Sequence, residues 1–347
     1  MALDFQLVCF DSFGAKSACT LVKTPDITIL LEPGVAVMHH SFPGTIKQKN
    51  EWHHNGLLAI KDAIKKSDVL ISSHYHLDHF IDTDFELFRN KLLFMKNPNE
   101  YINDNQRNRA ELFYQHLYPY YNNYNIYDNK NIVLQYNNPL EDIPLACNMD
   151  YGDYNQRKKQ LMEKGKRWFE RRVKNWNKKE NINDIHTENI NVFFPENKTF
   201  IFGQTTITCS KPLFHGIEYA RVGWVFSTLI ECNGKKILHS SDLCGPMIED
   251  YAEMIINENP DILILDGPMT YMYGFMLTTI NLKRTIDNLI RIIKESDIEL
   301  IIYDHHLCRD KRYKQRTKPV WHTAIEYGKT LVTASEYLGK TPAVLEN

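Results

Sequence analysis

The sequence lacks any long apolar segment, and it has almost no net charge. No apolar run approaches the roughly 18–20 residues that a bilayer-spanning helix needs. The first residues contain neither a basic region nor the apolar stretch of a secretory signal, so we expect a cytoplasmic protein with no membrane partner. With 41 Lys and Arg against 43 Asp and Glu, the formal charge is −2. This balance argues against a protein that coats nucleic acid with its whole surface.

Paired cysteines are also absent. The seven cysteines are scattered along the chain, and none form a Cys-x-x-Cys pair. The sequence therefore predicts neither a zinc ribbon nor a thioredoxin-type site. A reducing, intracellular compartment is the simplest account of this cysteine usage.

The order of the apolar segments indicates an α/β fold. The predicted strands cover residues 5–10, 18–22, 27–31, 69–72, 199–202, 205–209, 224–232, 236–240, 262–265 and 300–303. The predicted helices cover residues 57–66, 105–117, 156–176, 247–256, 277–294 and 323–338. Asn233-Gly234 joins two of the strands with the strongest short hairpin signal. Strands first, then strands alternating with helices, predict two packed sheets with helices outside, an αββα sandwich.

The segment 85–197 differs in composition, because it is rich in Asn, Tyr, Lys and Arg. We interpret it as a helical cap or lid inserted into a single domain that spans 1–347, and long insertions of this kind are often functional. Within it, 157–179 is dense in Lys and Arg, with Trp168 and Trp176 interleaved, as a nucleic-acid contact requires. Met162, Phe169 and Trp176 nevertheless fall on one helical face. An amphipathic cap helix is therefore favoured over RNA or DNA binding.

The most informative motif is His74-Tyr75-His76-Leu77-Asp78-His79, which directly follows the apolar strand 69–72. Imidazole and carboxylate are the side chains that bind zinc and neighbouring metals at neutral pH. A turn with two histidines on one side and the Asp-His pair on the other can serve two metals about 3.5–4 Å apart. The motif predicts a metal centre at the end of this strand.

Three further polar sites follow predicted strands. His215 lies after the strand 205–209, Asp242 lies just past the hairpin, and His305 and His306 follow the strand 300–303. A single His or Asp at a strand end is more often a loop residue or a cap. Together, however, these residues supply what the first motif lacks, because two metals need roughly seven protein ligands.

With these residues in this order, the chain resembles the metallo-β-lactamase superfamily. Supporting matches are 30–34, Leu-Leu-Glu-Pro-Gly, and 263–268, Leu-Ile-Leu-Asp-Gly-Pro. The whole chain except the insertion follows the order of that superfamily, and it looks most like an uncharacterised, mainly archaeal branch of predicted metal-dependent hydrolases. The fold that this resemblance implies is the αββα sandwich of the metallo-β-lactamase type.

The resemblance also implies a set of ligands for two divalent metal ions. One ion would be held by His74, His76 and His215, and the other by Asp78, His79 and the last histidine, with Asp242 bridging both. For the last ligand we favour His305 over His306, because it is the first residue after the strand-terminal Asp304. Zinc is the favoured metal, with manganese and iron as alternatives.

Two positions depart from the pattern of that superfamily. Glu32 stands where Asp is usual, so its supporting hydrogen bonds could be longer or rearranged, and Asp266 stands where RNA-processing members often carry Glu. Both are candidates for residues that orient the ligands. His39-His40, Tyr271 and Tyr273 could line the cleft, although loop or packing roles explain them as well.

The chemistry that follows is hydrolysis. A hydroxide shared by two divalent ions has its pKa drawn toward neutrality, and the ions neutralise charge that builds on the attacked group. Asp78, His305 and His306 are the candidate catalytic residues. The expected substrate is of ester type: a phosphodiester, lactone, thioester or carboxylic ester. The alternatives are a nuclease or RNA-processing phosphodiesterase that uses the basic segment, and a non-catalytic binding protein. A homo-oligomer is compatible with the sequence.

Overall fold

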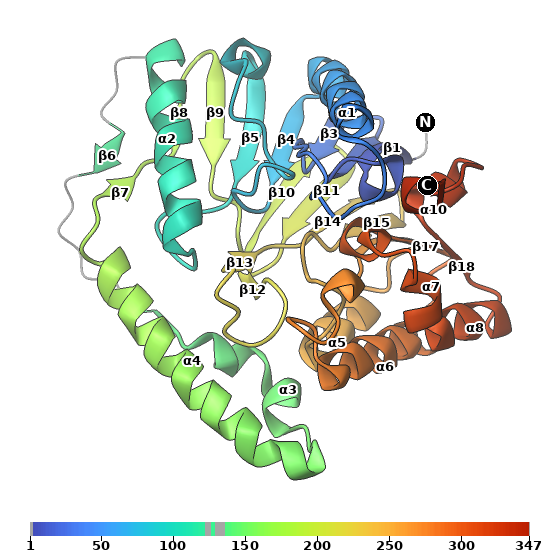
Figure 1. Cartoon of the computed structure of the whole chain (residues 1–347). Coiled ribbons are helices and arrows are strands. Elements are labelled where there is room, and N and C mark those ends of the chain that lie inside the picture. Colours follow the sequence, from blue (N-terminus) through green and yellow to red (C-terminus); the bar gives the residue numbers. More distant parts are fainter. Residues whose placement is uncertain (1–2, 122–125, 129–135, 347) are drawn as a thin grey trace.

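Two seven-stranded sheets face each other at the centre of the computed structural model, which describes residues 3–121, 126–128 and 136–346. Helices cover the outer faces of both sheets (Figure 1). The predicted αββα sandwich is therefore confirmed. Within the described part of the chain, no helix has the length and apolar character that crossing a bilayer requires.

The first sheet contains the N-terminal meander and then turns parallel. In spatial order its strands are β1 (Asp4–Phe10), β2 (Ala18–Lys23), β3 (Thr28–Leu31), β4 (Val69–Ser72), β5 (Lys91–Met95), β9 (Ile190–Phe193) and β8 (Ile185–His186). The pairs from β1 to β3 are antiparallel, and those from β3 to β9 are parallel. Strand β4 is buried along its whole length, as the continuous apolar run before His74 indicates.

The second sheet has the same plan. Its strands are β10 (Lys198–Phe202), β11 (Thr205–Cys209), β14 (Thr228–Cys232), β15 (Lys235–His239), β16 (Ile262–Asp266), β17 (Leu300–Asp304) and β18 (Thr330–Val332). The turn between β14 and β15 has positive φ at both Asn233 and Gly234, which confirms the predicted hairpin. Strands β15 to β18 are parallel, so the chain segments after them emerge at one edge.

Apolar side chains alternate between the two faces of each sheet. The inner faces meet through residues such as Ile29, Ile71, Ile230 and Ile302. The main helices are α1 (Ile46–Lys66), α2 (Asp104–Tyr121), α4 (Asn155–Trp176), α5 (Glu249–Glu258), α6 (Thr279–Glu295) and α8 (Lys318–Glu326). Helices α1 and α2 pack on the outer face of the first sheet, and α5, α6 and α8 on that of the second.

Three predicted elements are wrong in extent. Helix α1 begins at Ile46, well before the predicted residue 57, because Thr45 and Gln48 form a capping box ahead of a polar first half. The predicted strand 224–232 is two strands: β13 (Trp224–Val225) pairs with β12 (Leu213–Phe214), and β14 starts later. The predicted helix 323–338 is interrupted by β18, which pairs with β17, and then continues as α9 (Ala334–Tyr337).

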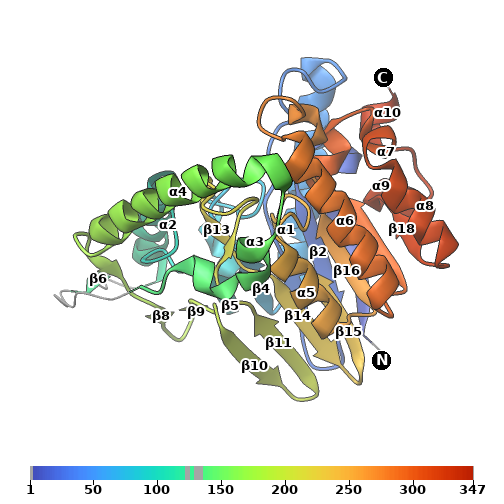
Figure 2. The same ribbon diagram turned by 90° about the horizontal axis from the view of Figure 1, so that it is seen from below.

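The segment 85–197 contributes to both the sheet and the surface. Strands β5, β8 and β9 lie within it and belong to the first sheet. The remainder carries α2, α3 (Pro144–Asn148) and α4, and the long helix α4 lies apart from both sheets (Figure 2). Phe169 and Trp176 of α4 are buried, and Met162, Trp168 and Val173 are partly buried against the core, which confirms an amphipathic helix. Its role as a cap stays a prediction.

Candidate metal centre

The turn after β4 is fixed by its own backbone and by Tyr75. The His79 and Phe80 amides both donate to the carbonyl of His76, at 2.9 and 3.3 Å. Between the ligand candidates, the fully buried Tyr75 donates its hydroxyl to the carbonyl of Lys96 at 2.7 Å. This hydrogen bond holds the Tyr75 side chain in the core, and the side chains of the neighbouring His74 and His76 face the opposite way.

Gly34 allows a second chain segment to pass close behind this turn. A Cβ at Gly34 would lie 2.3 Å from the Phe80 amide nitrogen and 2.4 Å from that of His79. Only glycine permits so close a backbone approach. The approach places Glu32, which has a left-handed φ of 51°, directly beside the motif.

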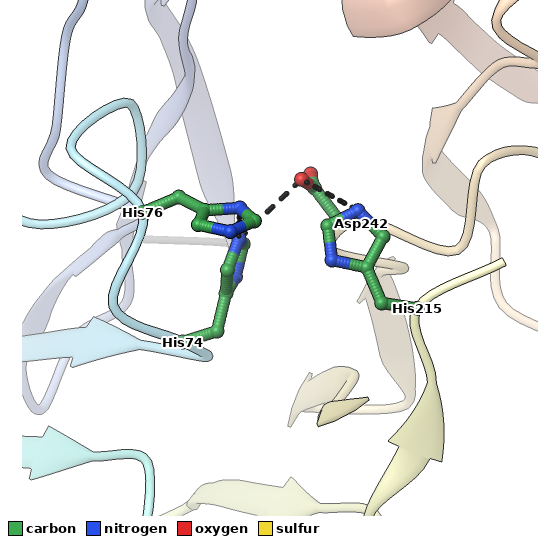
Figure 3. A group of neighbouring side chains, drawn as sticks. All are labelled: His74, His76, His215 and Asp242. Atoms are coloured by element: carbon green, nitrogen blue, oxygen red, sulfur yellow. Dashed lines mark hydrogen bonds and ion pairs between the residues drawn. The ribbon is translucent and has the colours of Figure 1, made fainter. Parts of the chain in front are cut away.

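The first group of ligand candidates comprises His74, His76, His215 and Asp242. Figure 3 shows the rings of His74 and His76 on one side and the side chains of His215 and Asp242 on the other, directed into the same space. The Nε2 atoms of His74 and His215 each lie 3.4 Å from Asp242 Oδ2. His76 Nδ1 lies 3.0 Å from His74 Nε2. Four nitrogen and oxygen donors therefore surround one point.

The second group comprises Asp78, His79, His305 and the same Asp242. The Nε2 atoms of His79 and His305 are 3.2 Å apart and lie 2.9 and 3.1 Å from Asp242 Oδ1. Asp78 Oδ2 lies 4.0 Å from His305 Nε2. The structure thus places His305, and not His306, with Asp78 and His79.

The donor set fits two divalent metal ions. Four ligands at about 2.1 Å around a tetrahedral zinc ion lie about 3.4 Å from one another, and the separations across this centre are close to that value. Asp242 Oδ1 is buried and only 2.9 Å from His79 Nε2, yet it takes part in no hydrogen bond. Atoms that lie this close together without the geometry of a hydrogen bond have the arrangement expected of ligands around a shared ion. Imidazole and carboxylate suit zinc, and also iron or manganese.

The outer nitrogen of three of the candidate ligand histidines is held by a neighbouring oxygen. His79 Nδ1 lies 2.8 Å from Glu32 Oε2, and His305 Nδ1 lies 2.9 Å from Asp11 Oδ1. His74 Nδ1 lies 3.0 Å from the Ser73 hydroxyl. Such partners fix the tautomer and direct Nε2 toward the metal. Glu32 makes a hydrogen bond of ordinary length in place of the usual Asp, so the longer contact considered for it does not occur.

Burial and charge within the centre shift the pKa values of its residues in opposite directions. Burial alone would raise the pKa of Asp242, but the neighbouring His79 and His305 lower it well below its ordinary value. Burial would lower the pKa of His79, but the carboxylate of Asp242 outweighs this and helps raise it to about 10. Burial lowers the pKa of His76 to about 3 and that of His215 well below its ordinary value. His76 and His215 are therefore neutral, the form in which imidazole binds a metal.

His306 stands beside the centre with a partner of its own. Its Nδ1 lies 3.0 and 3.1 Å from the two carboxylate oxygens of Asp266, which also accept the backbone amides of His306 and Cys244. Asp266, proposed from the sequence as an orienting residue, thus contacts the second histidine of the pair. The Cys244 thiol is also near His215 and His306, but burial and Asp266 raise its pKa well above the ordinary value.

Two residues at the centre were not found from the sequence. Arg309 is buried, pairs with Asp11 through Nε, and reaches Asp78 Oδ2 with Nη2 at 3.4 Å. Asp11 in turn orients His305. Asp11 directly follows β1, so it carried the same strand-end signal as the predicted ligands. Arg309 carried no signal, because only the folded chain brings it to Asp11, 298 positions away.

All predicted site residues meet at one edge of the sandwich. Strained backbone accompanies them, because Glu32, Ser241 and His305 adopt positive φ values of 51°, 54° and 56° without being glycine. A cavity of about 370 Å³ opens onto the centre and is lined by residues that include His76, Asp78, His215, Asp242 and His306. His239, by contrast, packs away from the cavity with Nε2 2.9 Å from the carbonyl of Ala18.

Curated relatives match almost the whole chain. The UPF0282 protein of Methanopyrus kandleri is 29% identical over 355 residues, covering 97% of this chain and 94% of the relative. That of Methanocaldococcus jannaschii is 30% identical over 335 residues, covering 91% and 88%. That of Saccharolobus solfataricus is 28% identical, covering 98% and 89%. These relatives are archaeal, as the resemblance predicts. No family model matches the chain.

Solved structures resemble the chain more distantly. The metallo-β-lactamase fold protein YhfI from Bacillus subtilis aligns with a TM-score of 0.45 and 13% identity over 95% of each chain. The short form of human tRNase Z aligns with a TM-score of 0.39 and 10% identity, covering 88% of this chain and 92% of that one. At these values neither likeness carries an argument about function.

Proposed function

The chain belongs to the UPF0282 family, and we propose that it is a hydrolase that uses two divalent metal ions, zinc above all, to cleave an ester-type substrate. The substrate would be a phosphodiester, lactone, thioester or carboxylic ester. The buried histidine and aspartate clusters support this proposal.

One observation carries the proposal: the carboxylate of Asp242 is shared between two sets of histidines. Its Oδ2 faces His74 and His215, and its Oδ1 faces His79 and His305. A buried carboxylate divided in this way between two sets of donors is suited to bridge two cations. A purely structural Asp would instead use both oxygens in aligned hydrogen bonds.

The residues that would hold the ions are the two groups described above. Two bound divalent ions would supply a water of lowered pKa as nucleophile and would neutralise charge that builds on the attacked group. The chain itself keeps Asp78 ionised: burial would raise its pKa, but His79, His305 and Arg309 lower it well below the ordinary value. An ionised Asp78, partly open to the cavity, can orient the attacking water.

His306 is suited to transfer a proton to the leaving group. Its Nδ1–H donates to Asp266, so the tautomer leaves Nε2 free for exchange with the cavity. General acid catalysis of this kind contributes about 100-fold to 10,000-fold in rate. Its Nδ1 is held by a carboxylate as in His79 and His305, but its ring lies outside the group of Asp78, His79 and His305, and on this ground we assign it to proton transfer.

A panel of substrates tests the proposal. Phosphodiesters, carboxylic esters, lactones and thioesters are offered to the purified full chain with added zinc, manganese or iron, and Asp78→Ala is run beside the wild type. We expect metal-dependent turnover of at least one class, lost in Asp78→Ala. Activity that persists in Asp78→Ala, or a chain that takes up none of the three metals, would contradict the proposal.

A nuclease is the second candidate, because the outer face of α4 is basic. The exposed basic residues of this face are Arg157, Lys159, Lys164, Lys166, Arg167, Arg171 and Lys174, and the exposed Glu163 and Glu170 lie among them. Such a surface would bind nucleic acid with an affinity that falls steeply as salt rises. Titration of RNA and DNA at several salt concentrations separates the candidates, and absence of binding at low salt would remove this one.

A further inference from the structure

A second cavity adjoins the metal centre. It has a volume of about 670 Å³ and lies between the segments 39–43, 269–276 and 309–316. It shares Lys16, Met269 and Arg309 with the cavity that opens onto the predicted ligands. The two cavities therefore adjoin at these three residues, which lie at their junction.

The second cavity is strongly basic. Five of its lining residues are Lys or Arg, and the only acid among them is Asp310. Arg309 is paired with Asp11, and Arg316 Nη1 lies 3.3 Å from Asp310 Oδ2. Lys16 and Arg312, in contrast, form no ion pair with any residue that the structure describes.

Lys16 is held in place although its charge is unpaired. Its backbone exchanges two hydrogen bonds of 2.9 Å with Ala36, which fix the residue at the junction of the two cavities. Burial and the nearby Arg309 lower the pKa of the Lys16 ammonium, and the carboxylates of Asp78 and Asp11 offset this only in part. A half-buried cation kept beside another cation is unfavourable by itself, and an anionic ligand would relieve this repulsion.

Other lining residues of this cavity offer a polar atom and flat or apolar surfaces. His39 Nε2 is buried without a hydrogen-bond partner, while His39 Nδ1 lies 2.7 Å from the Ser41 hydroxyl. The His39 ring stacks on Tyr271 with centroids 5.3 Å apart and an angle of 21° between the planes. Met269, Met272 and Met276 supply deformable apolar surface beside this pair.

We propose that this cavity binds an anionic group, a phosphate or a carboxylate, of a small substrate whose ester bond lies at the metal centre. Lys16, Arg312 and the free nitrogen of His39 would hold the anion, and the Tyr271 and methionine surfaces would contact the body of the molecule. The inference rests on the proposed hydrolase function for the placement of the ester. A volume of about 670 Å³ lies within the roughly 300–1,000 Å³ typical of small-molecule sites.

Anion binding to the full chain tests the proposal without any measurement of turnover. Inorganic phosphate, succinate and a 12-nucleotide single strand of DNA are titrated by calorimetry into zinc-loaded protein and into protein stripped with a chelator. The variants are Lys16→Met and Arg312→Gln. The control is Lys235→Gln, at the first residue of β15, the end of the strand that lies away from Asp242. Zinc content is measured on every sample.

We expect phosphate or succinate to bind the stripped chain, and each cavity variant to weaken that binding about tenfold, with no change in the control. The anion that binds more tightly identifies phosphate or carboxylate as the group. Failure of both anions to bind, or equal binding by the variants, overturns the proposal even if two zinc ions are present. Normal anion binding by a chain that takes up no zinc contradicts the hydrolase function instead. If single-stranded DNA binds more than tenfold more tightly than either anion, and this binding depends on Lys16, the ligand of the cavity is a nucleic acid and the small-molecule proposal is overturned.

Discussion

Asp242→Asn is the sharpest test of the shared carboxylate. The substitution keeps the size and shape of the side chain and removes its charge, so it creates no cavity in the buried edge of the sandwich. Each of the two ions would have four candidate protein ligands, and Asp242 belongs to both sets. One substitution therefore weakens two sites at once. We expect the zinc content to fall from about two ions per chain to one or fewer.

The magnitude follows from the role of a direct ligand. Loss of a group that merely orients a ligand costs about 10–100-fold in metal affinity, so 100-fold, or about 2.7 kcal/mol, is a lower estimate for loss of the shared carboxylate. Zinc binds the folded chain, so the same free energy is lost from its stabilisation by zinc. Over 347 residues, an unfolding entropy of about 2.1 cal/mol/K per residue converts this loss into about 4 °C of melting temperature for each ion.

The assay compares melting temperatures with and without zinc, together with metal analysis of the dialysed protein. Asp261→Asn is the matched control, because it makes the same chemical change at the opposite end of the strands, where Asp261 accepts the Lys236 amide at 2.7 Å. That control should keep two ions and the full zinc-dependent rise in melting temperature. An Asp242→Asn variant that does the same would refute the bridging role.

Three other changes address separate parts of the structure. In His306→Gln we expect kcat to fall about 100-fold with two zinc ions still bound, and loss of zinc would show that His306 is itself a ligand. In the metal-free chain the pKa of His79 is raised to about 10 and that of His305 is also raised, so both are protonated at pH 7 and must lose their protons to bind a metal. Zinc binding at pH 7 should then release about two protons, with affinity rising with pH. Calorimetry in buffers of different ionisation enthalpy counts the protons, and zero release would contradict the protonated state of the two histidines in the metal-free chain. Gly165→Ala gains about 1 kcal/mol of helix propensity, but the new Cβ would lie 2.3 Å from the Tyr219 ring, and this clash outweighs the gain. Urea denaturation should therefore show a lower free energy of unfolding. A stabilised variant would show that α4 does not pack tightly against the loop that contains Tyr219.

The predicted ligands could be found because each follows a buried strand. His74 comes two residues after β4, Asp242 three residues after β15, and His305 directly after β17. Parallel strands place the segments after them at one edge, so polar residues at these positions tend to meet.

The remaining features depend on contacts that local sequence does not encode. The sequence pattern predicts a helix across the residues of β18, because these three residues form a strand only by pairing with β17. Arg309 lies in a polar loop, and nothing around it in the sequence distinguishes it from an exposed basic residue. The second cavity combines three segments that are distant in the chain, so its charge could not be seen before the fold was known.

The insertion contributes to the centre through packing. Trp168 of α4 stacks on Trp224 with ring centroids 5.5 Å apart, and Phe169 contacts Tyr219 and Trp224. Tyr219 belongs to the loop that follows His215, Trp224 begins β13, and the His215 amide donates to the carbonyl of Gly223 at 3.0 Å. The helix therefore supports His215, the candidate ligand that does not lie at the end of a long strand. Helix α4 therefore has a structural role that does not depend on whether its basic face binds a ligand.

The two halves of the sandwich must both be folded before either ion can bind. His74, His76, Asp78 and His79 follow a strand of the first sheet, whereas His215 and His305 come from the C-terminal half with Asp242. Each ion would therefore join the halves, and the second cavity is divided in the same way, with Lys16 and His39 on one side and the segments 269–276 and 309–316 on the other. The distance from the ester to the anionic group is then set by the packing of the two sheets. A rigid interface of this kind can select substrates by length, so esters that differ only in the spacing of their anionic group should differ in KM.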